Sequence, residues 1–265
     1  MDWSQPAADP PAPADPGTPV DRPTRTGHWR TVVRGIGQLF ITAGLVILLF
    51  VVYELWWTGF TTKRDQHRLL GTLRQQWAHG RVIKDPPLGS AIAILRIPRF
   101  GPKYLFAIVE GVSTADLIKG PGHYPGTAMP GEIGNFAVAG HRTTYEHPFY
   151  SINRLRTGDP IVLETRNRWL TYTVEDIPGT KARYQEIVSP SDVAVSYPVP
   201  DQPDVNLAPT QRVLTFTSCN PRYSAAQRIV VHALLTASIP KSAGLPAALH
   251  GYRIASAAPG SGREG

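Results

Sequence analysis

The chain has 265 residues, a formal net charge of +7 at pH 7 and a hydrophobic fraction of 42%. This length and composition allow one sizeable domain with a packed core, plus additional segments. The basic balance is compatible with nucleic acid, an anionic membrane surface or an acidic cell wall as a partner. Because the sequence contains no run of five basic residues and no zinc-finger spacing, it argues against a nucleic-acid-binding protein.

The N-terminal part of the sequence predicts a tail followed by a membrane anchor. Residues 1–34 begin with a stretch rich in Ala, Pro and Asp, which favours a disordered tail. From Gly35 to Tyr53 there is no charged residue, and a helix of this length would span about 28 Å, close to the hydrocarbon thickness of a bilayer. Two tryptophans follow, as in an aromatic belt, and the bulky end of the run does not fit a signal-peptide cleavage site. We therefore predict a transmembrane helix over residues 35–57.

The charges that flank this predicted helix do not decide its orientation. Four arginines precede it and four basic residues follow it closely: Arg22, Arg25, Arg30 and Arg34, then Lys63, Arg64, Arg68 and Arg74. Since the cytoplasmic flank is expected to carry the excess of basic residues, an equal count favours neither direction.

Beyond the anchor, residues 58–89 predict a stalk and a linker. Apolar residues recur there at helical spacing, at Leu69, Leu70, Leu73 and Trp77. Gly80 breaks this pattern, and two consecutive prolines then stiffen the segment. We therefore expect a short amphipathic helix between the anchor and the following domain.

Residues 90–239 change in character and predict a mainly β domain. Short β-rich runs alternate there with turn signals, at 91–97, 104–110, 135–140, 160–166, 169–177, 212–218 and 228–237. This spacing favours a β-barrel or a β-sandwich, with one short helix at 114–120. Residues 240–265 are rich in Ala, Gly, Ser and Pro, so we expect a flexible C-terminal tail.

The single cysteine, Cys219, is the first candidate for chemistry. One cysteine excludes an internal disulfide and a cysteine-rich metal site, and by itself it is better explained as a small buried core residue. However, Cys219 ends a predicted strand and precedes Asn220 and Pro221, a position that holds a side chain rigidly and leaves it accessible. A thiol becomes a good nucleophile when a base lies near it, and the natural base is a histidine that the fold brings close.

Among the eight histidines, His141 is the favoured partner for this thiol. It ends the run NFAVAGH, again at the terminus of a predicted strand. The other histidines lie in tail, stalk or loop segments or in the middle of a predicted strand, where structural roles explain them better: His28, His67, His79, His123, His147, His232 and His250.

Arg228 is the favoured third residue, because it opens the last predicted strand nine residues after Cys219. Its guanidinium remains charged at any relevant pH and presents its donors in a fixed fork. It could therefore bind a developing oxyanion or orient a peptide carbonyl. Arg222 also lies close to Cys219 in the sequence and is the competing candidate.

Taken together, these residues resemble the sortase family. The resemblance covers roughly the whole predicted β domain and rests on AGHRTTYEHPFY around His141, TFTSC ending at Cys219, and Arg228 at the start of RIVVHA. The family pattern at the cysteine is Thr-Leu-x-Thr-Cys, so this chain departs from it at Phe216 and Ser218. The residues around the histidine are most similar to class E sortases of high-GC Gram-positive bacteria, the actinobacteria.

The resemblance implies an eight-stranded sortase-type β-barrel with short helices, preceded by a single transmembrane helix. It also implies a plasma-membrane location, with a cytoplasmic N-terminal tail, an anchor in contact with membrane lipid and an extracellular catalytic barrel. We expect no cofactor and no metal, because the loop carboxylates Asp201 and Asp204 are too few to predict a calcium site.

The implied activity is that of a cysteine transpeptidase acting on secreted proteins that bear a C-terminal sorting signal. Cys219 would cleave a Leu-Ala-x-Thr-Gly-like signal between Thr and Gly through a thioester, which an amine of a peptidoglycan precursor or a pilin lysine would resolve. His141 would act first as general acid and then as general base, and Arg228 would hold the oxyanion or the substrate backbone. Thr217 and Ser218 are further candidates for substrate contact.

Two other classes of protein fit parts of this pattern. An L,D-transpeptidase-like cell-wall enzyme also uses Cys and His, but Ser-x-Gly-Cys and His-Gly elements would then lie close together, whereas His141 here is distant from Cys219. A non-catalytic, membrane-tethered binding barrel would not need His, Cys and Arg in this order. A thiol reagent distinguishes a cysteine enzyme from a binding barrel, because it would abolish the activity of the enzyme and leave the binding module mostly intact.

Overall fold

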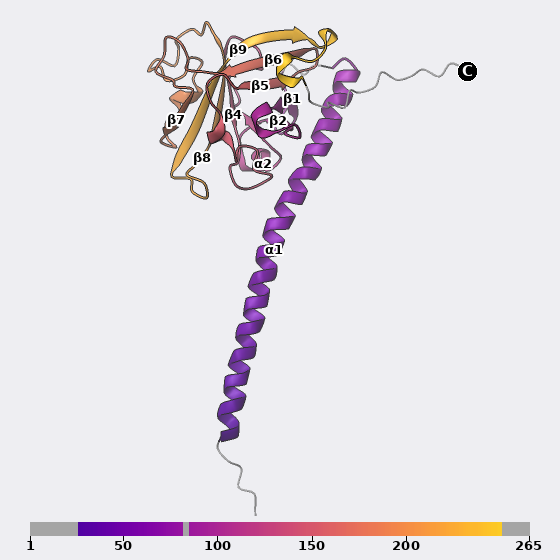
Figure 1. Ribbon diagram of the computed structural model, residues 1–265, viewed down its shortest axis with the longest axis vertical. Helices are drawn as coiled ribbons and strands as arrows, with labels where there is room; N and C mark the ends of the chain where they lie inside the picture. Colours follow the sequence, from indigo (N-terminus) through magenta and orange to yellow (C-terminus); the bar gives the residue numbers. More distant parts are fainter. Residues whose placement is uncertain (1–25, 82–84, 251–265) are drawn as a thin grey trace, which may run out of the picture. The chain divides into compact units, whose positions relative to one another are not determined.

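The computed structural model describes residues 26–81 and 85–250, and the chain divides after Tyr53 into two compact units. The first unit contains the N-terminal part of helix α1 (Thr26–Ala78), and the second contains the rest of α1 and all the strands (Figure 1). Most of the tail predicted over residues 1–34 lies outside the described residues, and its last part is helical because α1 already begins at Thr26.

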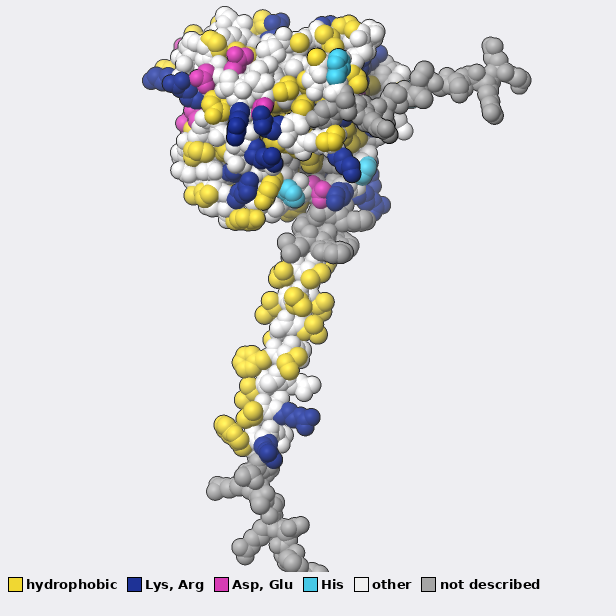
Figure 2. Space-filling model, in the orientation of Figure 1, with side chains coloured by type: hydrophobic (Ala, Val, Ile, Leu, Met, Phe, Trp, Pro, Cys, Tyr) yellow, Lys and Arg dark blue, Asp and Glu magenta, His cyan; other side chains and the backbone are white. Residues whose placement is uncertain are grey.

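The part of α1 in the first unit is long and apolar enough to cross a membrane. The candidate span, Trp29–Tyr53, has 25 residues and a mean hydropathy of 2.4, with none of it buried in the protein. Apolar side chains cover much of the face of this helix that is visible in Figure 2. A helix of this length, apolar along its exposed surface, fits a lipid environment.

The second unit is a closed β-barrel. Its strands are β1 (Ala91–Arg96), β2 (Phe106–Glu110), β3 (Gly122–His123), β4 (Gly134–Ala139), β5 (Pro160–Glu164), β6 (Arg168–Val174), β7 (Gln185–Val188), β8 (Arg212–Asn220) and β9 (Gln227–Pro240). They are hydrogen-bonded in the order β6-β5-β1-β2-β3-β4-β8-β9, and β9 pairs again with β6 to close a ring of eight (Figure 1). The strand β7 pairs with β9 beyond this ring. The predicted eight-stranded barrel is thus confirmed.

Short helices connect the strands. They are η1 (Pro98–Phe100), α2 (Thr114–Leu117), η2 (Ile152–Arg154), η3 (Ala194–Ser196), η4 (Lys241–Ala243) and η5 (Ala247–Leu249). The last two lie in the segment predicted as a flexible tail, and Leu249 is fully buried against Val162 and Trp169. The structure therefore differs from the expectation as far as residue 250, because a buried leucine in an otherwise small-residue segment is enough to hold it on the barrel.

The paired strands β4 and β8 are deeply buried along most of their length. They run parallel, and all of β4 and the six residues 213–218 of β8 are buried. On the inside, Phe136 and Phe216 belong to the main hydrophobic core. On the other face, the loop carrying η3 covers β4, where the Asn135 amide donates to the carbonyls of Val195 and Tyr197, each at 3.0 Å. Burial on both faces explains why these strands lack a simple alternation of polar and apolar residues.

The C-terminal part of α1 packs against the barrel. The Gln66 amide donates to the carbonyls of Ala107 and Lys119 at 3.1 and 2.6 Å, and its oxygen accepts from the Ala107 amide at 2.7 Å. Leu70 and Leu73 form a small core with residues of β1 and β2. The segment expected to be a stalk therefore covers the outer face of these strands over this length, since that face is apolar and needs a partner.

Candidate active site

The register of β4 and β8 brings His141 and Cys219 to the same edge of the sheet. The parallel pairing runs to Ala139 opposite Thr217, and the Gly140 amide still donates to the Thr217 carbonyl at 3.1 Å. His141 and Cys219 each follow two residues after this last pair. Two side chains that are 78 residues apart in the sequence thus stand at neighbouring strand ends, as the hypothesis of a Cys/His pair requires.

Two hydroxyl groups hold these strand ends in place. The Ser218 hydroxyl is buried and donates to the Gly140 carbonyl at 2.7 Å, which ties the residue before the cysteine to the residue before the histidine. The Thr217 hydroxyl is also buried and lies 3.0 Å from the hydroxyl of Tyr124. Both predicted substrate contacts are therefore engaged within the protein, where they orient the two candidate catalytic residues.

Arg228 lies directly opposite Cys219 in the antiparallel pairing of β8 with β9. Residues paired in this way project from the same face of the sheet, so the guanidinium and the thiol share one side. The Arg228 Nη1 group donates to the carbonyls of Ala225 and Gln227 at 3.0 and 2.9 Å, within the turn between the two strands.

The competing arginine, Arg222, also lies in this turn and contacts the loop after His141. Its guanidinium carbon lies 4.1 Å from the ring centroid of Tyr150, a cation–π arrangement. Its donors reach the Tyr150 carbonyl at 3.3 Å and the Asn153 side-chain oxygen at 3.2 Å. The structure thus brings both arginines to the turn after Cys219, with Arg228 in the register position opposite the thiol.

A third arginine, Arg142, was missed by the sequence reasoning. It is 6% exposed, and its Nη1 group donates to the Cys219 carbonyl at 3.0 Å and to the Asn220 side-chain oxygen at 2.6 Å. Burial lowers the pKa of Arg142, the nearby charge of Arg222 lowers it further, and Cys219 acts in the opposite direction. Its position directly after His141 is the signal that could have predicted this role. If the strands that end near His141 and Cys219 are parallel neighbours, Arg142 lies beside Asn220, the residue that follows Cys219.

His141 occupies a partly buried position at the start of a strained loop. Burial lowers the pKa of its imidazole, and its Nε2 atom is buried without a hydrogen-bond partner among the described residues. The following loop places Tyr145, Glu146 and His147 at φ values of 51°, 59° and 37°, which residues other than glycine seldom adopt. An ion pair of 3.6 Å between Glu146 and Lys63 of α1 accompanies this conformation. Such strain is commonly retained where a loop must present a functional group.

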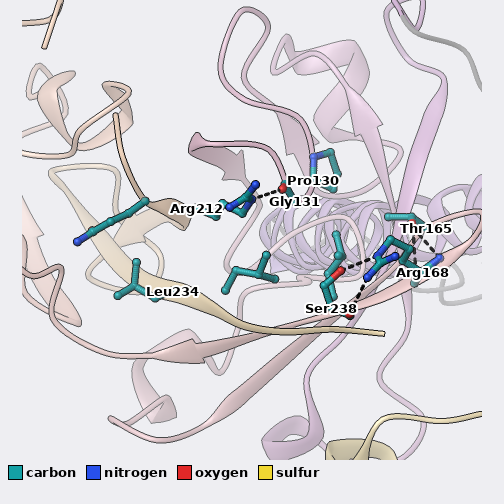
Figure 3. Close-up of a pocket in the computed structure, with 10 residues that line it drawn as sticks. Pro130, Gly131, Thr165, Arg168, Arg212, Leu234 and Ser238 are labelled. Carbon is teal, nitrogen blue, oxygen red and sulfur yellow. Dashed lines mark hydrogen bonds between the residues drawn. The ribbon is translucent and has the colours of Figure 1, made fainter. Parts of the chain in front are cut away.

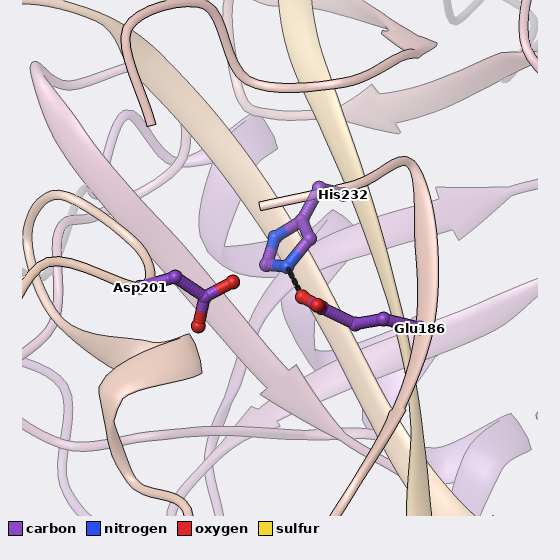
Figure 4. Close-up of side chains that lie close together, drawn as sticks. All are labelled: Glu186, Asp201 and His232. Atoms are coloured by element: carbon purple, nitrogen blue, oxygen red, sulfur yellow. Dashed lines mark hydrogen bonds and ion pairs between the residues drawn. The ribbon is translucent and has the colours of Figure 1, made fainter. Parts of the chain in front are cut away.

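One cluster of described side chains could hold a metal ion, and it lies on other elements. Glu186 of β7, Asp201 of the following loop and His232 of β9 place their ligand atoms within 4.8 Å of one another (Figure 4). Burial lowers the pKa of His232 to about 4 and raises that of Asp201 to about 6, so at mildly acidic pH the histidine is neutral and the Asp201 carboxyl is largely protonated. Of the two loop carboxylates considered from the sequence, Asp204 does not belong to this cluster. The expectation of no metal stays a prediction.

A cavity of about 590 Å³ opens on another part of the barrel, with Pro130, Leu234 and Ser238 in its lining (Figure 3). Two arginines border it: Arg168 donates to the Ser238 hydroxyl and carbonyl, each at 2.7 Å, and Arg212 donates to a backbone carbonyl at 2.8 Å. Its lining includes none of the three residues predicted to act in catalysis, so the candidate active site lies elsewhere.

Similar proteins share this barrel. Residues 95–236 match the model of the Sortase domain family. Sortase SrtE1 of Streptomyces coelicolor is 36% identical over an alignment of 226 residues, which covers 82% of this chain and 60% of that protein. The chain thus spans about 60% of the length of this curated relative.

Solved structures agree with this match. The SrtF sortase from Corynebacterium diphtheriae superposes with a TM-score of 0.60 at 37% identity, covering 64% of this chain and 96% of that one. Sortase E1 from Streptomyces coelicolor, solved with a tripeptide in the active site, gives 0.53 at 35% identity, covering 61% and 97%.

The closed barrel with its N-terminal apolar helix, together with these matches, defines the class as that of a sortase domain. The chain belongs to the sortase family, and the expected similarity to class E sortases is confirmed. Membership of this family removes the L,D-transpeptidase-like alternative.

Proposed function

We propose that this protein is a membrane-anchored cysteine transpeptidase that cleaves a sorting signal similar to Leu-Ala-x-Thr-Gly between Thr and Gly. The single observation that carries the proposal is the register of the sheet, which brings His141 and Cys219 to adjacent strand ends and Arg228 opposite the thiol. The tripeptide in the active site of Streptomyces coelicolor sortase E1 supports a peptide as the substrate class.

The proposed reaction has two transfers. The Cys219 thiolate attacks the carbonyl carbon of Thr, the C–N bond breaks, and the departing glycine nitrogen takes a proton from the His141 imidazolium. The acyl group is then held as a thioester. An acceptor amine attacks this carbonyl and passes a proton to the neutral His141, and the C–S bond breaks to restore the thiolate.

Arg228 is assigned the stabilisation of the negative charge that develops on the carbonyl oxygen in both steps. Its Nη1 group is committed to two backbone carbonyls of the turn, whereas no contact within the described residues engages its Nε and Nη2 groups. Arg228 therefore keeps the N–H donors of its Nε and Nη2 groups for an oxyanion on the side of the sheet that carries the thiol.

The location and the partners follow from the same proposal. The apolar part of α1 anchors the protein in the plasma membrane, with the N-terminus in the cytoplasm and the barrel outside the cell. Secreted proteins with a C-terminal sorting signal are the donors. The acceptor is an amine of a peptidoglycan precursor or of a pilin lysine.

Cleavage of a quenched fluorescent Leu-Ala-x-Thr-Gly peptide by the full-length protein in detergent micelles tests this function. We expect cleavage by the native protein and at least a 1000-fold loss in Cys219→Ala, His141→Ala and Arg228→Ala. Undiminished cleavage in Cys219→Ala would refute the function. If Arg228→Ala is active and Arg222→Ala is inactive, Arg222 and not Arg228 stabilises the oxyanion.

A further inference from the structure

Three arginines surround the turn after Cys219, and within the described residues none of them pairs with a carboxylate. Arg142, Arg222 and Arg228 donate only to carbonyl groups, to side-chain amides and to a phenol. Elsewhere in the barrel, Arg96 and Arg183 each form an ion pair with a carboxylate. In the part of the chain that the structure describes, no carboxylate therefore neutralises the positive charge next to the candidate nucleophile.

Two of these guanidiniums converge on one acceptor. The Asn153 side-chain oxygen accepts from Nη2 of Arg142 at 3.3 Å and from Nη2 of Arg222 at 3.2 Å. The two Nη2 groups are thus no further apart than two hydrogen bonds. Like charges at this separation repel each other, and the cost is larger in a partly buried site than in water.

Unsatisfied donors occur at the same place. The Nε atoms of Arg142 and Arg222 are both buried and have no hydrogen-bond partner among the described residues. Buried polar groups without a partner are uncommon in native proteins, so two of them on a pair of adjacent cations call for an explanation. An anion bound between the guanidiniums would relieve both the repulsion and the lack of acceptors.

The two arginines differ in how firmly they are held. Arg142 makes contacts of 2.6 and 3.0 Å to the backbone and side chain next to Cys219 and is almost fully buried. Arg222 is more exposed, and its contacts of 3.2 to 3.4 Å to neutral groups are long for hydrogen bonds. Arg142 thus provides a fixed charge, and Arg222 provides a guanidinium that can turn toward a ligand.

We propose that Arg142 and Arg222 form a carboxylate-binding site beside Cys219, which recognises a carboxylate carried by one of the two peptide substrates. This inference rests on the proposed transpeptidase function. The planar fork of a guanidinium matches the two oxygens of a carboxylate. If the acceptor carries the carboxylate, the site would hold its amine near the thioester and favour transfer over hydrolysis. If the sorting signal carries it, the site would select an acidic residue at position x.

Matched substrates test this site in the full-length protein in detergent micelles. In the acceptor arm, triglycine is compared with triglycinamide, which differ only in the terminal carboxylate. In the donor arm, Leu-Ala-Glu-Thr-Gly is compared with Leu-Ala-Gln-Thr-Gly. We expect a preference of at least fivefold for the carboxylate in one arm, and that arm identifies the substrate that carries the group.

Variants connect the preference to the two arginines. Arg222→Gln is expected to reduce the preference to about onefold, and Arg222→Lys to leave an intermediate value because it keeps the charge and loses the fork. Arg183→Gln, a surface arginine paired with Asp176, is the matched control and should keep the native ratio. The ratio compares two substrates on the same protein, so a partial loss of folded protein does not change it.

Several results would overturn this inference. Equal rates in both arms of the native protein would contradict it while leaving the transpeptidase function intact, because cleavage itself would still be seen. A preference that persists in Arg222→Gln would assign the recognition to other residues. Absence of any cleavage would instead remove the proposed function, and with it the basis of this inference.

Discussion

His141 lies in surroundings that disfavour its charged form. Its ring is partly buried and lies 5.0 Å from the Tyr145 ring between centroids, in a tilted arrangement, and its Nε2 atom has no hydrogen-bond partner among the described residues. In the proposed mechanism the same ring must carry a proton in one step and accept one in the next. A lowered imidazole pKa makes it a readier proton donor to the leaving amine and leaves it mostly neutral at pH 7.

The titration of His141 can be measured directly. Because burial penalises the imidazolium, we expect an NMR midpoint below the ordinary value of about 6.5. Because the pKa of His141 is lower in the folded than in the unfolded protein, its contribution to the free energy of unfolding is complete above about pH 6.5. This contribution is lost as the pH falls through the pKa of the folded state. His67, an exposed histidine of α1, provides an internal comparison. A midpoint at or above 6.5 for His141 would contradict the burial argument.

The candidate residues differ in how far the sequence could predict them. Cys219 and His141 were predictable because each ends an apolar run, and a strand that ends there presents its last side chain at the rim of a barrel. Arg142 was not, because its partner is the backbone of a residue 77 positions away, and that contact follows only from the strand register. The roles of Ser218 and Thr217 in holding the strand ends have the same origin.

At the scale of elements, Gly140 permits the close approach of the loop that follows His141. A Cβ atom at this position would lie 2.6 Å from a ring carbon of Phe149, closer than atoms can pack. The ring is fully buried and packs at a tilt against the Phe216 ring, with 4.7 Å between the centroids, so it cannot move aside easily. The glycine between β4 and the histidine is therefore required by packing.

Gly140→Ala is expected to lower the free energy of unfolding by about 1–3 kcal/mol through overpacking. It should also reduce peptide cleavage, since relief of the clash must shift either Phe149 or His141. Gly71→Ala is the control, because that glycine is helical with open space around it and the change should stabilise by up to about 1 kcal/mol. Urea unfolding of both variants measures the effect, and a native-like stability of Gly140→Ala would show that the loop is not packed as described.

A chain of hydrogen bonds links β4, β8 and β9 to the loop after β7. The Thr215 hydroxyl donates to the Asn135 side-chain oxygen at 2.7 Å and lies 2.8 Å from Nδ1 of His232. The other ring nitrogen of His232 lies 3.0 Å from Glu186, next to Asp201. The loop is therefore attached to the barrel through a group of side chains that shares protons.

This attachment predicts a pH-dependent effect of Asp201→Asn. Burial and the neighbouring Glu186 raise the folded pKa of Asp201 to about 6, so its contribution to stability is complete below about pH 3.8 and is lost as the pH rises through 6. Asparagine resembles the protonated acid and does not titrate. The melting temperature of the variant minus that of the native protein should therefore be larger at pH 7.5 than at pH 4.5. Asp204→Asn in the same loop is the control, and a difference that does not change with pH would contradict the assignment.

At the scale of the whole molecule, the described chain combines a helix that is long and apolar enough to cross a membrane with a barrel against which the C-terminal part of the same helix packs. The helical period of residues 62–79 was visible in the sequence, but the surface that it covers was not. The apolar outer face of β1 and β2 becomes a partner for Leu70 and Leu73 only in the folded barrel. The packing of Leu249 was hidden for the same reason, since a leucine in a segment rich in small residues gives no periodic signal.

Removal of the C-terminal part of α1 should therefore destabilise the barrel. A protein that begins at residue 81 loses the three hydrogen bonds of Gln66 and the burial of Leu70 and Leu73. The burial of each leucine side chain contributes about 1.5–3 kcal/mol to the free energy of unfolding. We expect it to melt about 10 °C below a protein that begins at residue 61. Gln66→Ala in the longer protein should reproduce part of this loss, whereas Gln75→Ala, at an exposed position of α1, should not. Equal melting temperatures of the two proteins would mean that the helix is only a tether.

In the proposed reaction, Cys219 carries the acyl group. The most direct test is mass spectrometry of the full-length protein after rapid acid quenching of its reaction with a Leu-Ala-x-Thr-Gly peptide. We predict an added mass equal to the acyl fragment that ends in Thr, located on Cys219 by peptide mapping and released by hydroxylamine, as expected of a thioester. Peptide cleavage without such an adduct, or an adduct on any other residue, would show that Cys219 is not the acyl carrier.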